Sequence, residues 1–178
     1  APLHGSVEVA EGEDETKVIA NAENVCKITH FDPRCVASCV AVSVAIRRLV
    51  HGENDIESLI DSIKKIAVGY DSRVEPFFDL AQSPDIEALN LDEEETMGYT
   101  LKTLSAGIWA LRFGPSFEEG VSAVIHQGGD ADTNAAVAGA LLGGRYGYES
   151  IPRHWIEGLN WKKYMNRVAE ELYVVCTR

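Results

Sequence analysis

The chain has 178 residues, a formal net charge of −12 and a pI near 4.8. This acidic balance argues against non-specific binding to nucleic acid or to an anionic membrane, because both repel a polyanion. The length and a hydrophobic content of 46% predict one domain, residues 1–178, with a sizeable core. No apolar run reaches the roughly 18 residues of a membrane-spanning helix, and the sequence shows no basic-then-apolar signal-peptide pattern.

Helical signals follow one another along nearly the whole chain, so the expected fold class is all-α. Asp32 and Pro33 mark one helix start, since aspartate is a favoured N-cap and proline fits the first helical position. The valines of residues 35–50 are compatible with a strand, but the stretch is too long for one. Residues 69–98 are expected to be the least organised part, with a solvated acidic run at 92–95. The expected helices span residues 14–28, 33–50, 55–68, 100–113, 116–125, 131–142 and 161–175.

The four cysteines are expected to be free thiols. They are Cys26, Cys35, Cys39 and Cys176. Cys35 and Cys39 would share one helix face, which is poor geometry for a disulfide, and no Cys-x-x-Cys or histidine pair completes a zinc site. Buried small thiols fit a reducing compartment, so we expect a cytoplasmic location.

Two carboxylates and a hydroxyl directly follow a glycine pair, in the run Gly128-Gly129-Asp130-Ala131-Asp132-Thr133. Hard divalent cations such as Mg²⁺ bind through oxygens, so Asp130, Asp132 and Thr133 are candidate metal ligands. The glycines allow a sharp turn or a close approach of backbone to a ligand. The alternative is structural: Asp130 caps a helix, and Asp132 favours its positive end.

The helix expected at residues 131–142 is apolar on nearly all sides and is therefore expected to be buried in a core. Such burial would push the two preceding acids toward the interior, where an unpaired charge is costly. A bound metal would neutralise them. The pattern leaves the metal-binding and the capping interpretations both open.

Several motifs lie in a fixed order along this helical sequence. The strongest is the run at 128–133 followed by the small-residue stretch that ends at Gly143. The others are Ile28-Thr29-His30 with Asp32-Pro33, Gly98-Tyr99-Thr100-Leu101, Ile108-Trp109-Ala110-Leu111, Tyr146-Gly147, and Ile151-Pro152 with Trp155. Together they resemble the ADP-ribosylglycohydrolase family over nearly the whole chain. The resemblance implies an all-α, orthogonal multi-helix bundle, of which this chain carries the C-terminal part.

The resemblance implies a hydrolase that cleaves the glycosidic bond joining ADP-ribose to a modified protein side chain or a small molecule. It also implies two Mg²⁺ or Mn²⁺ ions, with ADP-ribose or an ADP-ribosylated protein as partner, and neither nucleic acid nor membrane. The implied metal ligands are Asp130, Asp132 and Thr133, and the implied substrate-binding residues are His30, Gly98, Tyr99, Gly128 and Gly129. An alternative for His30 is a helix-end histidine that caps a carbonyl, and for Gly98-Tyr99 a turn followed by a half-buried tyrosine.

Family members normally have another half before the point where this chain begins. That half carries a Gly-Asp-Ala-x-Gly segment, a Thr-Asp-Asp run and a glycine-rich phosphate loop, none of which occurs here. We therefore expect one side of a two-metal site, no catalytic acid or base, and a chain that is part of a longer enzyme. A separate polypeptide that carries the other half is a second possibility. An inactive ADP-ribose-binding or structural member of the family, and a generic divalent-cation protein, are the alternative functions.

Overall fold

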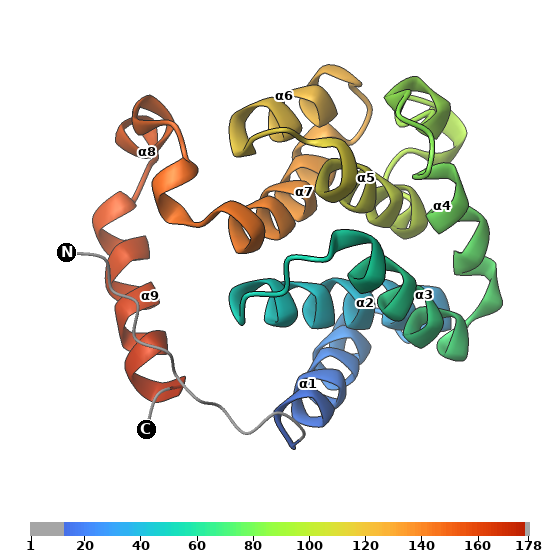
Figure 1. Ribbon diagram of the computed structural model, residues 1–178, viewed down its shortest axis with the longest axis horizontal. Coiled ribbons are helices and arrows are strands. Elements are labelled where there is room, and N and C mark those ends of the chain that lie inside the picture. Colours follow the sequence, from blue (N-terminus) through green and yellow to red (C-terminus); the bar gives the residue numbers. More distant parts are fainter. Residues whose placement is uncertain (1–12, 177–178) are drawn as a thin grey trace.

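The computed structural model describes residues 13–176, and within this range the regular elements are all helices (Figure 1). The all-α prediction is confirmed. In chain order the α-helices are α1 (Glu13–Thr29), α2 (Pro33–Val50), α3 (Ile56–Tyr70), α4 (Glu75–Leu80), α5 (Thr100–Phe113), α6 (Phe117–His126), α7 (Ala131–Tyr146), α8 (Arg153–Gly158) and α9 (Lys162–Cys176). Short 3-10 turns lie at Ser72–Val74, Ile86–Leu89, Glu94–Thr96 and Tyr148–Ser150. None of the helices described here is long and apolar enough to cross a membrane.

The helix starts follow the capping residues of the sequence. The Asp32 carboxylate accepts a hydrogen bond of 2.9 Å from the backbone N–H of Arg34, and Pro33 occupies the first position of α2. The Ser116 hydroxyl accepts one of 3.1 Å from the N–H of Glu119 and opens α6. Each cap satisfies a backbone donor that the first helical turn cannot satisfy itself.

The structure contains helical turns that the sequence pattern did not predict. Residues 69–98 include the short helix α4, and α8 follows Pro152. Helix α7 was expected to end at residue 142 but extends to Tyr146. Its two glycines at 143 and 144 stay helical, and the helix ends only at Gly147, whose φ of +77° is left-handed.

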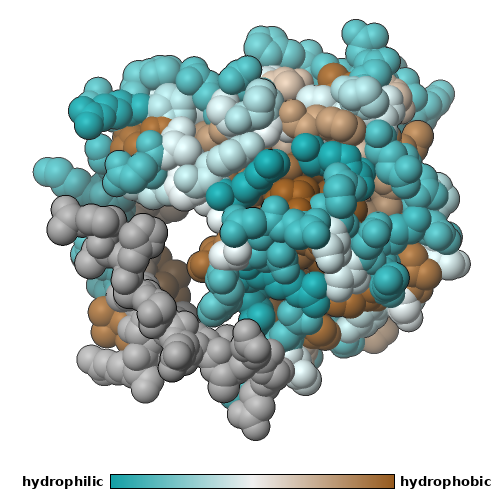
Figure 2. Space-filling view, in the orientation of Figure 1, coloured by the Kyte–Doolittle hydropathy of each residue, from teal (hydrophilic) through white to brown (hydrophobic). Residues whose placement is uncertain are grey.

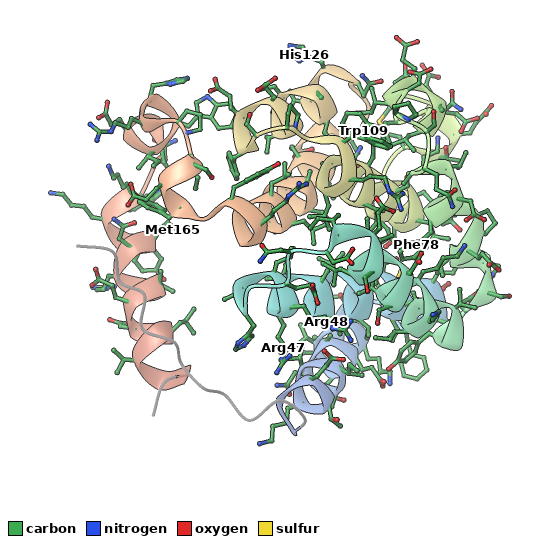
Figure 3. All side chains as sticks on the ribbon, in the orientation of Figure 1. Arg47, Arg48, Phe78, Trp109, His126 and Met165 are labelled. Atoms are coloured by element: carbon green, nitrogen blue, oxygen red, sulfur yellow. The ribbon has the colours of Figure 1, made fainter. Side chains whose placement is uncertain are left out.

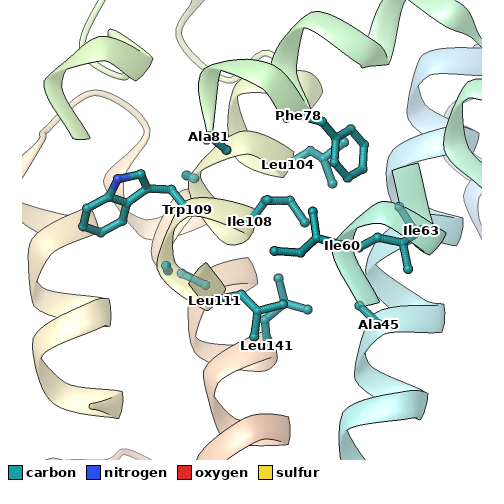
Figure 4. Packing of buried hydrophobic residues seen from close by; sticks show 14 of the residues in the cluster. Ala45, Ile60, Ile63, Phe78, Ala81, Leu104, Ile108, Trp109, Leu111 and Leu141 are labelled. Carbon is teal, nitrogen blue, oxygen red and sulfur yellow. The ribbon is translucent and has the colours of Figure 1, made fainter. Parts of the chain in front are cut away.

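Helix α5 is the centre of the core, because every residue from Leu101 to Leu111 is buried. Figure 4 shows Ile60 and Ile63 of α3 pointing toward Ile108 of α5, with Leu141 of α7 on another side. Helices α2, α4, α6 and α7 also pack against α5. A helix surrounded in this way has no polar face, which explains its apolar sequence.

Helix α7 is buried along one side only, so the expectation that it is buried all round was wrong. Its buried residues are Asn134, Ala138, Leu141 and Leu142. Ala136 and Ala140, on the opposite side, are exposed. Apolar sequence makes burial favourable, but a face is buried only where another element covers it, and among the described residues α2, α5 and α6 cover one side of α7.

Helix α9 stands apart from the bundle at the left of Figure 1. Its amphipathic sequence places apolar side chains in solvent: Trp161, which precedes it, is 81% exposed, and Met165 and Leu172 are 54% and 59% exposed. The face shown in Figure 2 is elsewhere mostly hydrophilic, with hydrophobic residues visible between polar ones.

An ion pair ties α1 to α2. The Arg48 guanidinium donates hydrogen bonds of 2.9 and 2.8 Å to the two carboxylate oxygens of Glu15, which is about one-quarter exposed (Figure 3). These bonds hold the pKa of Glu15 below its usual value of 4.5, because they stabilise the carboxylate form. The pair therefore stabilises the fold only while Glu15 is ionised.

Replacing Glu15 with Gln is expected to lower the free energy of unfolding by about 1 kcal/mol near neutral pH. A lowered pKa in the folded state means that the stabilisation is complete above the unfolded pKa and is lost as the pH falls through the folded pKa. Urea unfolding near pH 7 and near pH 3 measures both values, with the exposed Glu87→Gln as a matched control. If Glu15→Gln lowered the free energy of unfolding by the same amount near pH 3 as near pH 7, the ion pair with Arg48 would not be the source of the stabilisation.

Candidate functional site

A tight glycine turn sets the start of α7. Gly128 and Gly129 both have left-handed backbones, with φ of +72° and +61°. A β-carbon on Gly129 would lie 2.1 Å from the carbonyl oxygen of Leu91, a distance that no side chain tolerates. The two glycines thus let the turn at residues 127–130 pack on the loop before α5. This packing alone explains why residue 129 is a glycine.

The three predicted metal ligands lie together at the first turn of α7. Asp130 occupies the N-cap position, yet its carboxylate caps no backbone N–H. Instead its Oδ1 accepts a hydrogen bond of 2.9 Å from the Thr133 hydroxyl. Asp132, in the same turn, makes no hydrogen bond or ion pair with the described residues. The side-chain capping role proposed for Asp130 is therefore absent, and the oxygens are largely uncommitted.

These acids are not in the protein interior, as the sequence had suggested. Asp130 is half-buried, while Asp132 and Thr133 are exposed. The exposed face of α7 carries them, because no described helix covers that side. Among residues 13–176, no group of three or more His, Cys, Asp or Glu side chains is placed to hold a metal ion. The two aspartates and the threonine hydroxyl are candidate oxygen ligands, and by themselves they form an incomplete set.

A cavity of about 770 Å³ opens beside this turn, between α1, α2, α5 and α7. It brings together His30 from the end of α1, Gly98 from the turn before α5, and Thr133 from α7. Much of the remaining lining is apolar, including Val25 and Val137. The volume suits a ligand the size of a nucleotide. The other residues predicted to form the site, Tyr99, Gly128, Gly129, Asp130 and Asp132, do not line the cavity.

Gly98 links the cavity to the carboxylates. Its φ of +76° is left-handed, and a β-carbon there would lie 3.4 Å from Oδ2 of Asp130. The missing side chain leaves the space in front of the Asp130 carboxylate open toward the cavity. Gly98 therefore shapes the site by being small as well as by turning the chain.

His30 lies in the connection between α1 and α2, and this connection places its titratable side chain on the cavity wall. It is exposed, and its Nδ1 lies 3.0 Å from the Thr29 hydroxyl. Its backbone N–H donates to the carbonyl of Cys26, so the backbone continues the last turn of α1. The ring is not engaged in capping a carbonyl and is available to a ligand.

The Tyr99 side chain packs away from the cavity. Its hydroxyl accepts a hydrogen bond of 3.3 Å from Arg34, and its ring meets Phe77 edge-on at 5.6 Å between centroids. Arg34 is itself held by Asp32, and this pairing lowers the pKa of Asp32 well below its usual range. Tyr99 therefore serves packing in this arrangement. It is half-buried, as the alternative interpretation of Gly98-Tyr99 as a turn followed by a half-buried tyrosine predicted.

Sequence reasoning missed a buried polar pair beneath the first turn of α7. The Thr103 hydroxyl of α5 donates a hydrogen bond of 2.9 Å to the side-chain oxygen of Asn134. Both residues are buried, so the bond fixes the first turn of α7 against α5. Asn134 follows directly after the motif, and its position in an apolar stretch was the signal for such a partner.

The comparisons with known proteins agree with this arrangement of helices and motifs. The family model described as ADP-ribosylglycohydrolase matches residues 2–178. The chain therefore belongs to the ADP-ribosylglycohydrolase family. The solved structure titled "ADP-ribosylglycohydrolase-related protein complex" superposes with a TM-score of 0.71 at 28% sequence identity, and covers 87% of this chain and 52% of that one.

Two of the curated relatives that match carry hydrolase names. The chain is 26% identical over 157 residues to the ADP-ribosylarginine hydrolase Tri1 of Serratia proteamaculans, matching 88% of this chain and 41% of that protein. It is 24% identical over 136 residues to the ADP-ribosyl-[dinitrogen reductase] glycohydrolase of Rhodospirillum rubrum, with 76% and 41% covered. This chain thus spans less than half the length of these two relatives.

The packing of Gly129 predicts a sharp difference between two left-handed glycines. Gly129→Ala is expected to destabilise the fold by more than about 2 kcal/mol, because the added carbon collides with the Leu91 carbonyl. Gly52→Ala is the matched control: its φ of +92° is also positive but no atom lies within 4 Å of an added β-carbon, so only about 1 kcal/mol of backbone strain is expected. Denaturant unfolding compares them, and equal losses would refute the steric explanation.

Proposed function

We propose that this chain carries one side of the active site of a metal-dependent ADP-ribosyl hydrolase, which cleaves the glycosidic bond between ADP-ribose and a modified side chain or small molecule. The observation that carries the proposal is the position of Asp130, Asp132 and Thr133 next to the cavity that His30 and Gly98 line. Arginine is the favoured acceptor, because a relative that matches 88% of this chain is named an ADP-ribosylarginine hydrolase.

The oxygen donors fit Mg²⁺ or Mn²⁺. Both ions prefer carboxylate and hydroxyl oxygens, and Asp132 and one oxygen of Asp130 have no protein hydrogen bond to give up. Three protein ligands are too few to fix two ions in octahedral geometry. We propose that the remaining ligands, and the catalytic acid or base, belong to a part of the family fold outside this chain, on the same polypeptide or on a separate one.

The residues present serve binding and charge stabilisation. Cleavage of a glycosidic bond at the ribose builds positive charge on the sugar ring, which the Asp130 and Asp132 carboxylates would stabilise. The His30 ring is placed to form a hydrogen bond with a ligand in the cavity, and the bare Gly98 backbone leaves room for it. When bound, the ions would orient ribose hydroxyls and lower the pKa of a water molecule.

One observation favours the alternative, an inactive ADP-ribose-binding or structural protein. The described residues offer two carboxylates at this site and no third metal-ligating side chain of the His, Cys, Asp or Glu type. A chain that works alone would then bind the nucleotide without turnover. The free thiols of Cys26, Cys35 and Cys39 fit a reducing compartment, and we propose a cytoplasmic location for either function.

The test is the release of ADP-ribose from an ADP-ribosylated arginine peptide by the natural protein that contains this chain. Asp132→Ala is expected to lower kcat about 100-fold or more and to remove Mn²⁺ binding, measured by the loss of the free-Mn²⁺ spin-resonance signal. Asp61→Asn, an exposed aspartate on α3, is the matched control and should retain both.

Retained turnover in the Asp132→Ala variant would overturn the metal-dependent hydrolase. Absence of turnover in the wild-type protein, with ADP-ribose binding that His30→Ala weakens, would establish the binding protein in its place. Mn²⁺ binding without any ADP-ribose binding would indicate a generic cation protein.

A further inference from the structure

Two segments that are far apart in the sequence both line the cavity. The first is the connection between α1 and α2 with the start of α2, which contributes His30 and Cys35. The second is the turn before α5 with the start of that helix, which contributes Gly98 and Thr100. The shape of this part of the wall therefore depends on how the two segments are held relative to each other.

Three side chains of the same two segments do not line the cavity and bond to one another instead. They are Asp32, Arg34 and Tyr99. Each lies within two residues of a lining residue, so the three are placed to fix the wall without contacting a ligand. We refer to them as the Asp32–Arg34–Tyr99 clamp.

The first contact of the clamp fixes the Arg34 guanidinium relative to the start of α2. Besides capping the backbone N–H of Arg34, the Asp32 carboxylate accepts hydrogen bonds of 2.9 Å from Nε and 2.7 Å from Nη2 of the same residue. Two parallel bonds between a planar guanidinium and a carboxylate specify the orientation of both groups. Arg34 is therefore held firmly on the segment that carries His30.

The second contact reaches the turn before α5. The remaining guanidinium nitrogen, Nη1 of Arg34, donates a hydrogen bond of 3.3 Å to the Tyr99 hydroxyl, and the guanidinium carbon lies 5.6 Å from the centre of the Tyr99 ring. Phe77 of α4 meets the same ring edge-on at 5.6 Å between centroids. The Tyr99 side chain is thus held by α2 and by α4.

The turn before α5 needs such a hold. Tyr99 is the N-cap of α5, but its side chain caps no backbone N–H. Its backbone hydrogen bonds go to Thr96, Lys102 and Thr103, all within its own segment. The preceding Gly98 is a residue type that changes its backbone angles easily. Of the contacts that Tyr99 makes, those of its side chain are therefore the ones that tie the turn to other helices.

We propose that Arg34 is a positioning residue for the ADP-ribose site. Held by Asp32 and bonded to Tyr99, it keeps the His30 connection and the Gly98 turn in a fixed relation. Gly98 then stays in front of the Asp130 carboxylate, 3.4 Å from a Gly98 β-carbon. The inference rests on the proposed function, since ADP-ribose is the ligand for which this wall is shaped. Without the guanidinium the lining residues remain, but the two segments can shift, so binding weakens.

A second aspartate–arginine pair with the same local geometry provides a matched control. Asp71 accepts hydrogen bonds of 2.9 Å from the backbone N–H and from Nε of Arg73, as Asp32 does from Arg34. Among the described residues, the hydrogen bonds of Arg73 go to Asp71 alone. Replacing Arg73 therefore removes an equivalent local pair that has no bond to Tyr99.

The experiment measures hydrolysis of an ADP-ribosylated arginine peptide and calorimetric binding of ADP-ribose, using the natural protein that contains this chain. Arg34→Met keeps most of the aliphatic stem and removes the guanidinium. It is expected to raise KM and the Kd for ADP-ribose about 10-fold while kcat changes less than about 3-fold, because binding geometry is lost and no reacting group is removed. Arg73→Met should leave KM, Kd and kcat unchanged.

A double variant tests whether Arg34 acts through Tyr99. Tyr99→Phe keeps the ring and its contact with Phe77 but removes the hydroxyl that Arg34 bonds. It is expected to raise Kd about 3-fold, and the double variant should bind no more weakly than Arg34→Met alone, because both substitutions remove the same contact.

Hydrogen exchange in the ligand-free protein tests the clamp without relying on the proposed function. The backbone amides of residues 96–103 should exchange faster in Arg34→Met than in the wild type, because the turn has lost its tie to α2. The same amides should exchange at the wild-type rate in Arg73→Met.

Three results would overturn the proposal. They are an Arg34→Met variant with unchanged Kd and unchanged exchange, equal losses of binding in Arg34→Met and Arg73→Met, and additive losses in the double variant. If the wild-type protein bound no ADP-ribose, the proposed function would fail, and the exchange measurement would still decide whether Arg34 holds the turn.

Discussion

The close contact between α5 and α7 is the constraint on which the rest of the site depends. A β-carbon on Gly107 would lie 2.9 Å from a methyl of Val137 and 3.0 Å from one of Leu141. The bare glycine lets α7 lie directly on the buried α5, and the hydrogen bond from Thr103 to Asn134 fixes its register. Since α7 begins at the Asp130–Thr133 turn, this contact determines where the carboxylates stand relative to the cavity.

Much of the helical architecture could be predicted from the sequence, because capping residues and helical periodicity are local signals. The predicted span of residues 100–113 and the start of α2 at Pro33 agree with the structure. The extension of α7 through two glycines could not be predicted, since glycine favours a helix end only where the backbone turns left-handed, and that occurs at Gly147. Short helices such as α4 have too few residues to show a period.

The candidate site was only partly predictable. Motif resemblance selected His30, Gly98 and Thr133, which the fold brings to one cavity from three distant parts of the chain. It could not show that the Tyr99 side chain turns toward Arg34, because adjacent residues point in different directions and the choice depends on a partner 65 positions away. Composition also could not distinguish an apolar helix that is covered on all sides from one whose outer face is exposed to solvent. The prediction that Asp130 and Asp132 are buried was wrong for this reason.

The isolation of α9 has a consequence for the dynamics of the molecule. Among the described residues α9 packs little against the other helices, and a helix of 15 residues with so little packing is marginally stable in water. The amide hydrogens of α9 should therefore exchange with solvent through local fraying, while those of the enclosed α5 exchange only when the whole bundle unfolds. Proteases should cut first near Lys162 and Lys163, at the start of α9, and leave the remaining helices folded. The described part of the chain thus combines a cooperative core with a helix, α9, that opens independently of it.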